Sequence, residues 1–103
     1  QAMKITENDI YFGFVGGDLE HVNGGIAWTA EAAGRYGAKV HTLAQLTGVM
    51  RRDAIKAATR WTRNMIKAAE QRDLVDYPGV PYPGAAQDAQ RMLRAASKEA
   101  PRA

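Results

Sequence analysis

The sequence of 103 residues contains no cysteine, which excludes a disulfide framework and any thiolate metal site. It also contains no run of about eighteen apolar residues, so we expect no membrane-spanning helix. The N-terminus has neither the basic segment nor the apolar core of a secretory signal. These absences leave the compartment open between the cytoplasm and export without a cleaved signal.

Common catalytic motifs are also missing. There is no Gly-Lys-Ser/Thr of a P-loop, no G-x-G-x-x-G fingerprint and no nucleophile elbow. Asp18, Glu20 and His21 form a conceivable metal or acid–base cluster, but a further ligand would have to come from His41 or another distant residue, and metal sites usually need three or four converging ligands. We therefore expect no catalytic residues, no metal and no cofactor, and we favour a protein that is not an enzyme.

The overall composition is that of an ordinary globular domain. Hydrophobic residues make up 46% of the chain and charged residues 24%, which argues against wholesale disorder. The length suffices for one small domain with a modest core. The net charge of +3 weakly favours an acidic partner.

The chain divides into four segments. Residues 1–17 form an N-terminal arm, and residues 18–75 hold two long periodic stretches separated by Gly48. Residues 76–84, DYPGVPYPG, form a strap in which helix cannot continue because of its prolines and glycines. Residues 85–103 form a short Ala-rich amphipathic helix and a tail.

Residues 49–75 carry the clearest helical pattern. Apolar residues recur at steps of three or four, as a core-facing helix requires; they are Met50, Ala54, Ala57, Trp61, Met65 and Ala68. Good helix formers fill the remaining positions, and neither Gly nor Pro interrupts them. The sequence therefore predicts one long helix here.

Residues 18–47 are ambiguous. Apolar residues from Leu19 to Thr47 keep a heptad-like spacing, which predicts an all-α fold: a long antiparallel helical hairpin plus a short C-terminal helix. Several glycines argue against an all-α fold, because each destabilises a helix interior by roughly 1 kcal/mol relative to alanine. The alternative is a small α/β domain of order β-α-β-α, flavodoxin-like or otherwise doubly wound, with strands at DIYFGFV and AKVHTLAQL and a ligand loop at residues 16–25. We favour the all-α fold.

A turn and an aromatic spacing give a resemblance to a known family. Leu46-Thr47-Gly48 lies near the middle of the chain, and Trp61 follows thirteen residues after Gly48. The chain thereby resembles the small helical-hairpin substrates of type VII secretion, which carry a W-x-G turn; leucine stands here in place of that tryptophan. The resemblance implies a two-helix hairpin that pairs with itself or with a partner.

A basic stripe runs along the predicted second helix. Its cations follow one another at steps of three or four, opposite the apolar face; they are Arg52, Lys56, Arg60, Arg63 and Lys67. Like charges at this spacing repel by a few tenths of a kcal/mol each. The stripe could follow phosphates or an acidic protein, or it could simply be a solvated face.

Three functions stay open from the sequence. We favour a non-enzymatic interaction or assembly protein, type VII-like or part of a larger particle, which forms a homo-oligomer or binds a helical partner. Its core or oligomer face would consist of Ile26, Val40, Met50, Trp61, Met65 and Ile66. The second is nucleic-acid binding through the basic stripe on residues 52–67, and the third is a flavodoxin-like or other α/β ligand-binding domain with the 16–25 loop.

Overall fold

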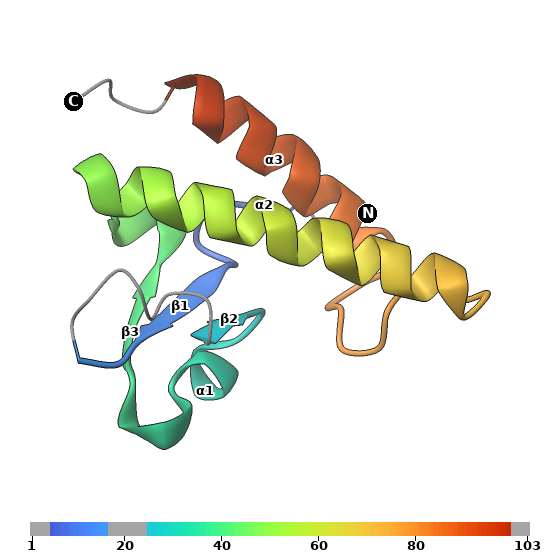
Figure 1. Ribbon diagram of the computed structural model, residues 1–103, viewed down its shortest axis with the longest axis horizontal. Coiled ribbons are helices and arrows are strands. Elements are labelled where there is room, and N and C mark those ends of the chain that lie inside the picture. Colours follow the sequence, from blue (N-terminus) through green and yellow to red (C-terminus); the bar gives the residue numbers. More distant parts are fainter. Residues whose placement is uncertain (1–4, 17–24, 100–103) are drawn as a thin grey trace.

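A short antiparallel sheet and two long helices make up the described part of the chain, which is residues 5–16 and 25–99 of the computed structural model. The strands are β1 (Tyr11–Phe14), β2 (Ile26–Ala27) and β3 (Lys39–Thr42), and the helices are α1 (Ala30–Ala33), α2 (Gly48–Gln71) and α3 (Ala85–Glu99). Two 3-10 turns, Arg35–Gly37 and Leu43–Gln45, flank β3. Figure 1 shows α2 running between the sheet on one side and α3 on the other.

The sheet has the order β2-β1-β3, and both pairings are antiparallel. Because side chains alternate along a strand, Phe12 and Phe14 share one face of β1 and Gly13 has the other. Both phenylalanines are buried in the main core. Gly13 instead lies against α1, where a Cβ atom would come within 2.0 Å of the Ala33 carbonyl oxygen. The sheet therefore has α1 on one face and the core on the other.

Helix α2 forms the centre of the core. It buries Ala54, Ala57 and Ala58 among the core residues of β1 and α3. These small side chains allow neighbouring backbones to approach closely. Helix α3 returns along α2 in Figure 1 and buries Leu93 together with Ala89 and other alanines.

The proline- and glycine-containing segment 76–84 connects the two long helices and holds the N-terminal segment. The Ile5 amide donates a hydrogen bond of 3.0 Å to the Tyr82 hydroxyl, which donates one of 2.7 Å to Asp88 Oδ2. The Gly84 amide donates to Asp76 Oδ1 at 3.0 Å. One tyrosine thus connects the start of the described chain to the first turn of α3.

The prediction of an all-α fold with a long helical hairpin is wrong. Helices α2 and α3 form where the sequence predicts helices, but residues 25–47 contain two strands and one short helix instead of a long one. Gly34 caps α1, and Gly37 adopts a left-handed φ of 73°. The helical pattern is therefore interrupted where glycines allow the chain to turn.

The flavodoxin-like alternative is wrong as well. It places strands at residues that include β1 and β3, but a doubly wound domain needs parallel strands. β1 and β3 are antiparallel neighbours, with Phe12 opposite His41. The 16–25 loop lies outside the described residues apart from its two ends.

Several residues of the predicted N-terminal arm contribute to the core. Ile5, Ile10 and Phe12 are buried, the last two completely. Ile5 stands alone among polar residues, and residues 10–15 form a continuous apolar run without alternation, so the sequence alone did not show which of these residues are buried. In the described part of the chain, no helix is long and apolar enough to span a membrane.

Candidate nucleic-acid interface

The basic stripe forms an exposed ridge on α2. All five cations of this ridge, Arg52, Lys56, Arg60, Arg63 and Lys67, are exposed. They lie opposite the face that packs on the sheet and α3, as their helical spacing requires. The structure therefore places the predicted binding residues together on one accessible surface.

Helix α3 adds two cations that the sequence analysis did not single out. A groove of about 410 Å³ between α2 and α3 is lined by Arg63 from α2 and by Arg94 and Lys98 from α3. Its remaining lining is Thr59, Gln90, Leu93 and Ser97. Arg94 and Lys98 are four residues apart on a helix face that lacks large apolar residues. This spacing is the one feature of the sequence that could have indicated a second basic face. Only the packing of α3 on α2 shows that they face Arg63.

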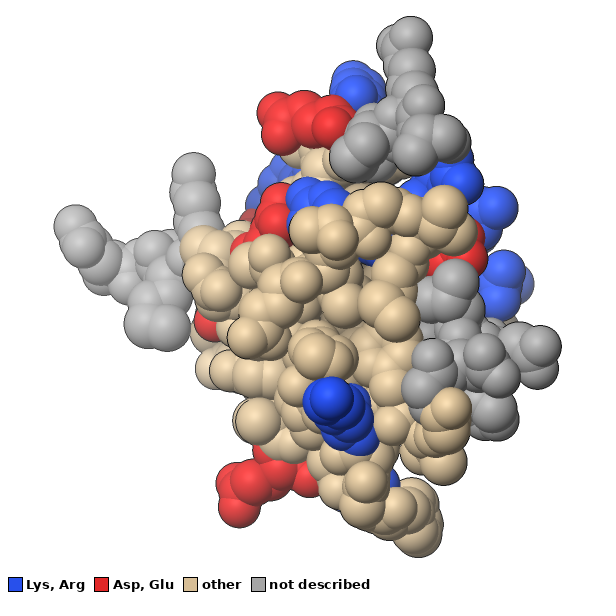
Figure 2. Space-filling model, turned by 90° about the vertical axis from the view of Figure 1, so that its left-hand side faces the viewer, with Lys and Arg blue, Asp and Glu red and all other residues tan. Residues whose placement is uncertain are grey.

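No ridge cation forms a salt bridge in the described part of the chain, although Asp53 and Glu70 of α2 each lie three residues from one, Lys56 and Lys67 respectively. Within the described residues the ion pairs are Arg51–Glu7 and Arg91–Asp88, and neither includes a ridge cation, Arg94 or Lys98. In Figure 2, most Lys and Arg side chains lie over the upper part, where α2 and α3 lie, with Asp and Glu side chains among them, whereas the lower part, over the sheet, is mostly uncharged apart from small basic and acidic areas. The positive charge thus belongs to the helical layer.

Arg51, although it adjoins the ridge in sequence, has a structural role. Its Nη1 and Nη2 atoms donate to the two carboxylate oxygens of Glu7 at 2.8 and 2.9 Å, and Nη1 also donates to the Leu43 carbonyl at 3.1 Å. This bidentate hydrogen bonding, strengthened by the charge of Arg51, lowers the pKa of Glu7 although partial burial opposes the shift. The pair joins the N-terminal segment to the start of α2.

The apolar residues predicted for a core or oligomer face are divided between different environments. Ile26 and Val40 lie in β2 and β3, so the prediction that they form a stripe on a helix is wrong. Met50 and Trp61 pack against the core of the same chain. Trp61 lies against Trp28, with ring centroids 4.8 Å apart, as expected for a core tryptophan.

Met65 and Ile66 are not among the apolar residues that pack against this core. Both are half-buried and line a small cavity of about 130 Å³ near the end of α2. Leu74 and Val75 line the same cavity and are exposed to 42% and 89%. An apolar area therefore remains accessible at this end of the helix.

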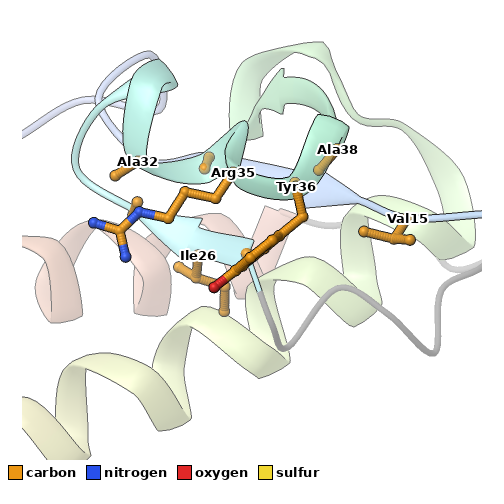
Figure 3. A pocket seen from close by; sticks show the side chains of 10 residues that line it. Val15, Ile26, Ala32, Arg35, Tyr36 and Ala38 are labelled. Carbon is orange, nitrogen blue, oxygen red and sulfur yellow. The ribbon is translucent and has the colours of Figure 1, made fainter.

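A separate pocket of about 570 Å³ lies in the sheet layer, on the side of α1 (Figure 3). Among the described residues, glycines and alanines make up most of its lining, and Arg35 is the one charged residue. Tyr36, which also lines this pocket, is 96% exposed and has a left-handed φ of 61°. This pocket offers much less positive charge than the helical layer.

The conceivable metal cluster of Asp18, Glu20 and His21 lies outside the described residues. His41, its suggested further ligand, is in β3 with its ring edge-on to Phe14 at a centroid distance of 5.7 Å. Residues 5–16 and 25–99 contain no group of three His, Cys, Asp or Glu side chains that could hold a metal ion. The metal hypothesis gains no support there.

Comparison with known proteins gives no family for this chain. No family model, no curated protein and no solved structure matches it. The LTG turn at 46–48 precedes α2 directly and follows a 3-10 turn, so it does not join two long helices as the type VII resemblance implies.

Proposed function

We propose that this protein binds nucleic acid through its phosphate backbone. The binding surface is the helical layer of α2 and α3, and we call it the basic surface. It consists of Arg52, Lys56, Arg60, Arg63, Lys67, Arg94 and Lys98. Contacts of this kind give affinity that depends strongly on salt and little on sequence.

The observation that carries this proposal is the groove between the two helices. Cations from separate helices, Arg63 on one side and Arg94 and Lys98 on the other, line the same space of about 410 Å³. The Ser97 hydroxyl and the Gln90 amide in the same groove can donate hydrogen bonds to phosphate oxygens. A surface that is only solvated does not require cations from two helices to line one groove.

The energetics also favour an anionic ligand. Neighbouring cations on the ridge and the pair Arg94–Lys98 are three or four residues apart, a spacing at which like charges destabilise a helix by roughly 0.2–0.5 kcal/mol per pair. A bound polyanion removes this repulsion. Phosphate contacts release counterions from the nucleic acid as well, which adds to the affinity.

The test is fluorescence anisotropy with a labelled random duplex at several salt concentrations. We expect binding at low salt that weakens steeply as salt rises. The double variant Arg60→Glu, Arg63→Glu should bind much more weakly, and because two phosphate contacts are lost, the slope of log K against log salt should fall by roughly 2.

The matched control is Arg35→Glu, Lys39→Glu, which changes the net charge equally on exposed residues of the sheet layer. It should keep most of the affinity and slope. Equal losses of affinity in both variants would show that binding depends on net charge alone and not on the basic surface. No binding of wild-type protein at low salt would overturn the proposal and favour an acidic protein as the partner.

A second candidate function is self-association, which the sequence analysis favoured. The observation that supports it is the apolar area at the end of α2, where Leu74 and Val75 are exposed beside Met65 and Ile66. Sedimentation over a range of protein concentrations tests it. A dimer that Val75→Asp dissociates would support this function, and a monomer at all concentrations would exclude it.

A further inference from the structure

An aromatic pocket lies beside the basic ridge on α2. The pocket has a volume of about 290 Å³ and is lined by Trp61, Asn64, Met65, Ala68 and Tyr77. Four of these residues belong to α2, and Tyr77 comes from the segment that connects α2 to α3. The pocket thus brings an aromatic residue from each of two segments to one space, with Asn64 as its one amide side chain.

Both aromatic side chains are held from outside the pocket. Trp61 packs against Trp28 at a centroid distance of 4.8 Å. The Arg72 guanidinium lies 5.8 Å from the centroid of the Tyr77 ring, within the range of a cation–π contact. A planar ligand would therefore meet aromatic groups that are already positioned.

Asn64 forms the edge of this pocket on the side of the ridge, whereas Trp61, Met65 and Ala68 belong to the apolar face of α2. Asn64 lies four residues after Arg60 and three before Lys67, and residues at these spacings are neighbours on a helix surface. A phosphate backbone that contacts Arg60 and Lys67 would consequently run along the side of the pocket that Asn64 forms. Its bases would be within reach of the aromatic side chains.

We propose that this pocket receives one unpaired base of a single-stranded nucleic acid whose backbone lies on the ridge. The inference rests on the proposed function and adds a preference for single strands. Bases stack on aromatic side chains with little dependence on sequence. The exposed Asn64 amide can both donate and accept hydrogen bonds at a base edge. In a duplex the bases are paired and stacked, so none is available to the pocket.

Three labelled ligands of equal length test the inference by anisotropy at one salt concentration: single-stranded oligothymidine, the same strand with abasic sites throughout, and a duplex. We expect oligothymidine to bind about 5- to 140-fold more tightly than the abasic strand, the range expected for one stacked base. Oligothymidine, but not the abasic strand, should also quench tryptophan emission, because Trp61 lines the pocket.

Two variants locate the effect. Tyr77→Leu should remove most of the difference between oligothymidine and the abasic strand, and Asn64→Ala, at an exposed helix position, should reduce it without risk to the fold. Duplex affinity should stay unchanged in both. Tyr36→Leu is the matched control, because Tyr36 is 96% exposed and lies outside this pocket.

The outcomes separate this inference from the proposed function. If oligothymidine and the abasic strand bind equally and salt-dependently, the base pocket is refuted while phosphate binding stands. The same conclusion follows if Tyr77→Leu and Asn64→Ala leave the difference intact. If none of the three ligands binds at low salt, both proposals fail.

Discussion

At the scale of single residues, Gly13 determines how closely α1 approaches the sheet. A Cβ atom at this position would lie 2.0 Å from the Ala33 carbonyl oxygen and 3.1 Å from the Ala38 Cβ. Since backbone atoms form the closest contact, a rotamer change cannot relieve it. The absence of a side chain at Gly13 is therefore a packing requirement.

We expect Gly13→Ala to lower the free energy of unfolding by about 1–3 kcal/mol, the usual cost of overpacking. Thermal and urea unfolding measure it. Gly37→Ala is the comparison, because nothing lies within 4 Å of its added Cβ and only its φ of +73° opposes the change. Wild-type stability in Gly13→Ala would show that α1 does not pack on β1 as described.

Tyr36 is the second residue whose conformation predicts an effect. It combines a left-handed φ of 61° with 96% exposure, and a left-handed conformation is unfavourable by roughly 1–2 kcal/mol for most residues but tolerated by asparagine. Tyr36→Asn should therefore raise the free energy of unfolding by about 0.5–1 kcal/mol. Tyr36→Leu, which keeps the strain, should not raise it. A loss of stability in Tyr36→Asn would show that the ring makes a stabilising contact.

At the scale of elements, the Glu7–Arg51 pair makes the attachment of the N-terminal segment to α2 depend on pH. Arg51 lowers the pKa of Glu7 in the folded state, so the unfolded chain binds more protons below the ordinary glutamate pKa of about 4.3. The stabilisation is present above that pH and is lost as the pH falls through the lower pKa of the folded protein.

Unfolding by urea at pH 7 and at pH 3 checks this expectation. Wild-type protein should lose more stability between these values than Glu7→Gln, because the variant has no carboxylate to protonate. Glu31→Gln, at an exposed position in α1, should behave like wild type. An identical pH dependence in Glu7→Gln and wild type would contradict a stabilising role for the pair.

The elements also show why the sequence predicted some parts of the fold and missed others. Helices α2 and α3 are long, and each repeats its apolar residues often enough to be recognised locally. The strands have only two to four residues, too few for a clear alternation. The apolar spacing across the glycine-rich connections around them also fits a helix that glycines destabilise. That ambiguity led to the incorrect prediction of a helical hairpin.

At the scale of the whole molecule, the basic surface places like charges on two packed helices. Added salt screens their repulsion. We therefore expect the melting temperature to rise by several degrees between about 20 and 300 mM NaCl, since roughly 1 kcal/mol corresponds to about 4–8 °C for a domain of this size. The rise should be smaller in Arg60→Glu, Arg63→Glu than in Arg35→Glu, Lys39→Glu. A melting temperature that falls with salt would show that favourable ion pairs dominate.

The sequence by itself determined the two long helices and the ridge of five cations on α2, because helical periodicity places residues three or four apart on one face whatever surrounds them. Tertiary structure alone decided the antiparallel sheet, the burial of Ile5 and Ile10, and the partners of the ridge. Arg94 and Lys98 join Arg63 only because α3 folds back along α2, and Tyr77 joins Trp61 only because the segment after α2 turns back on that helix. Contacts between distant segments depend on how complementary surfaces pack, and the spacing of residues along the chain does not predict that packing.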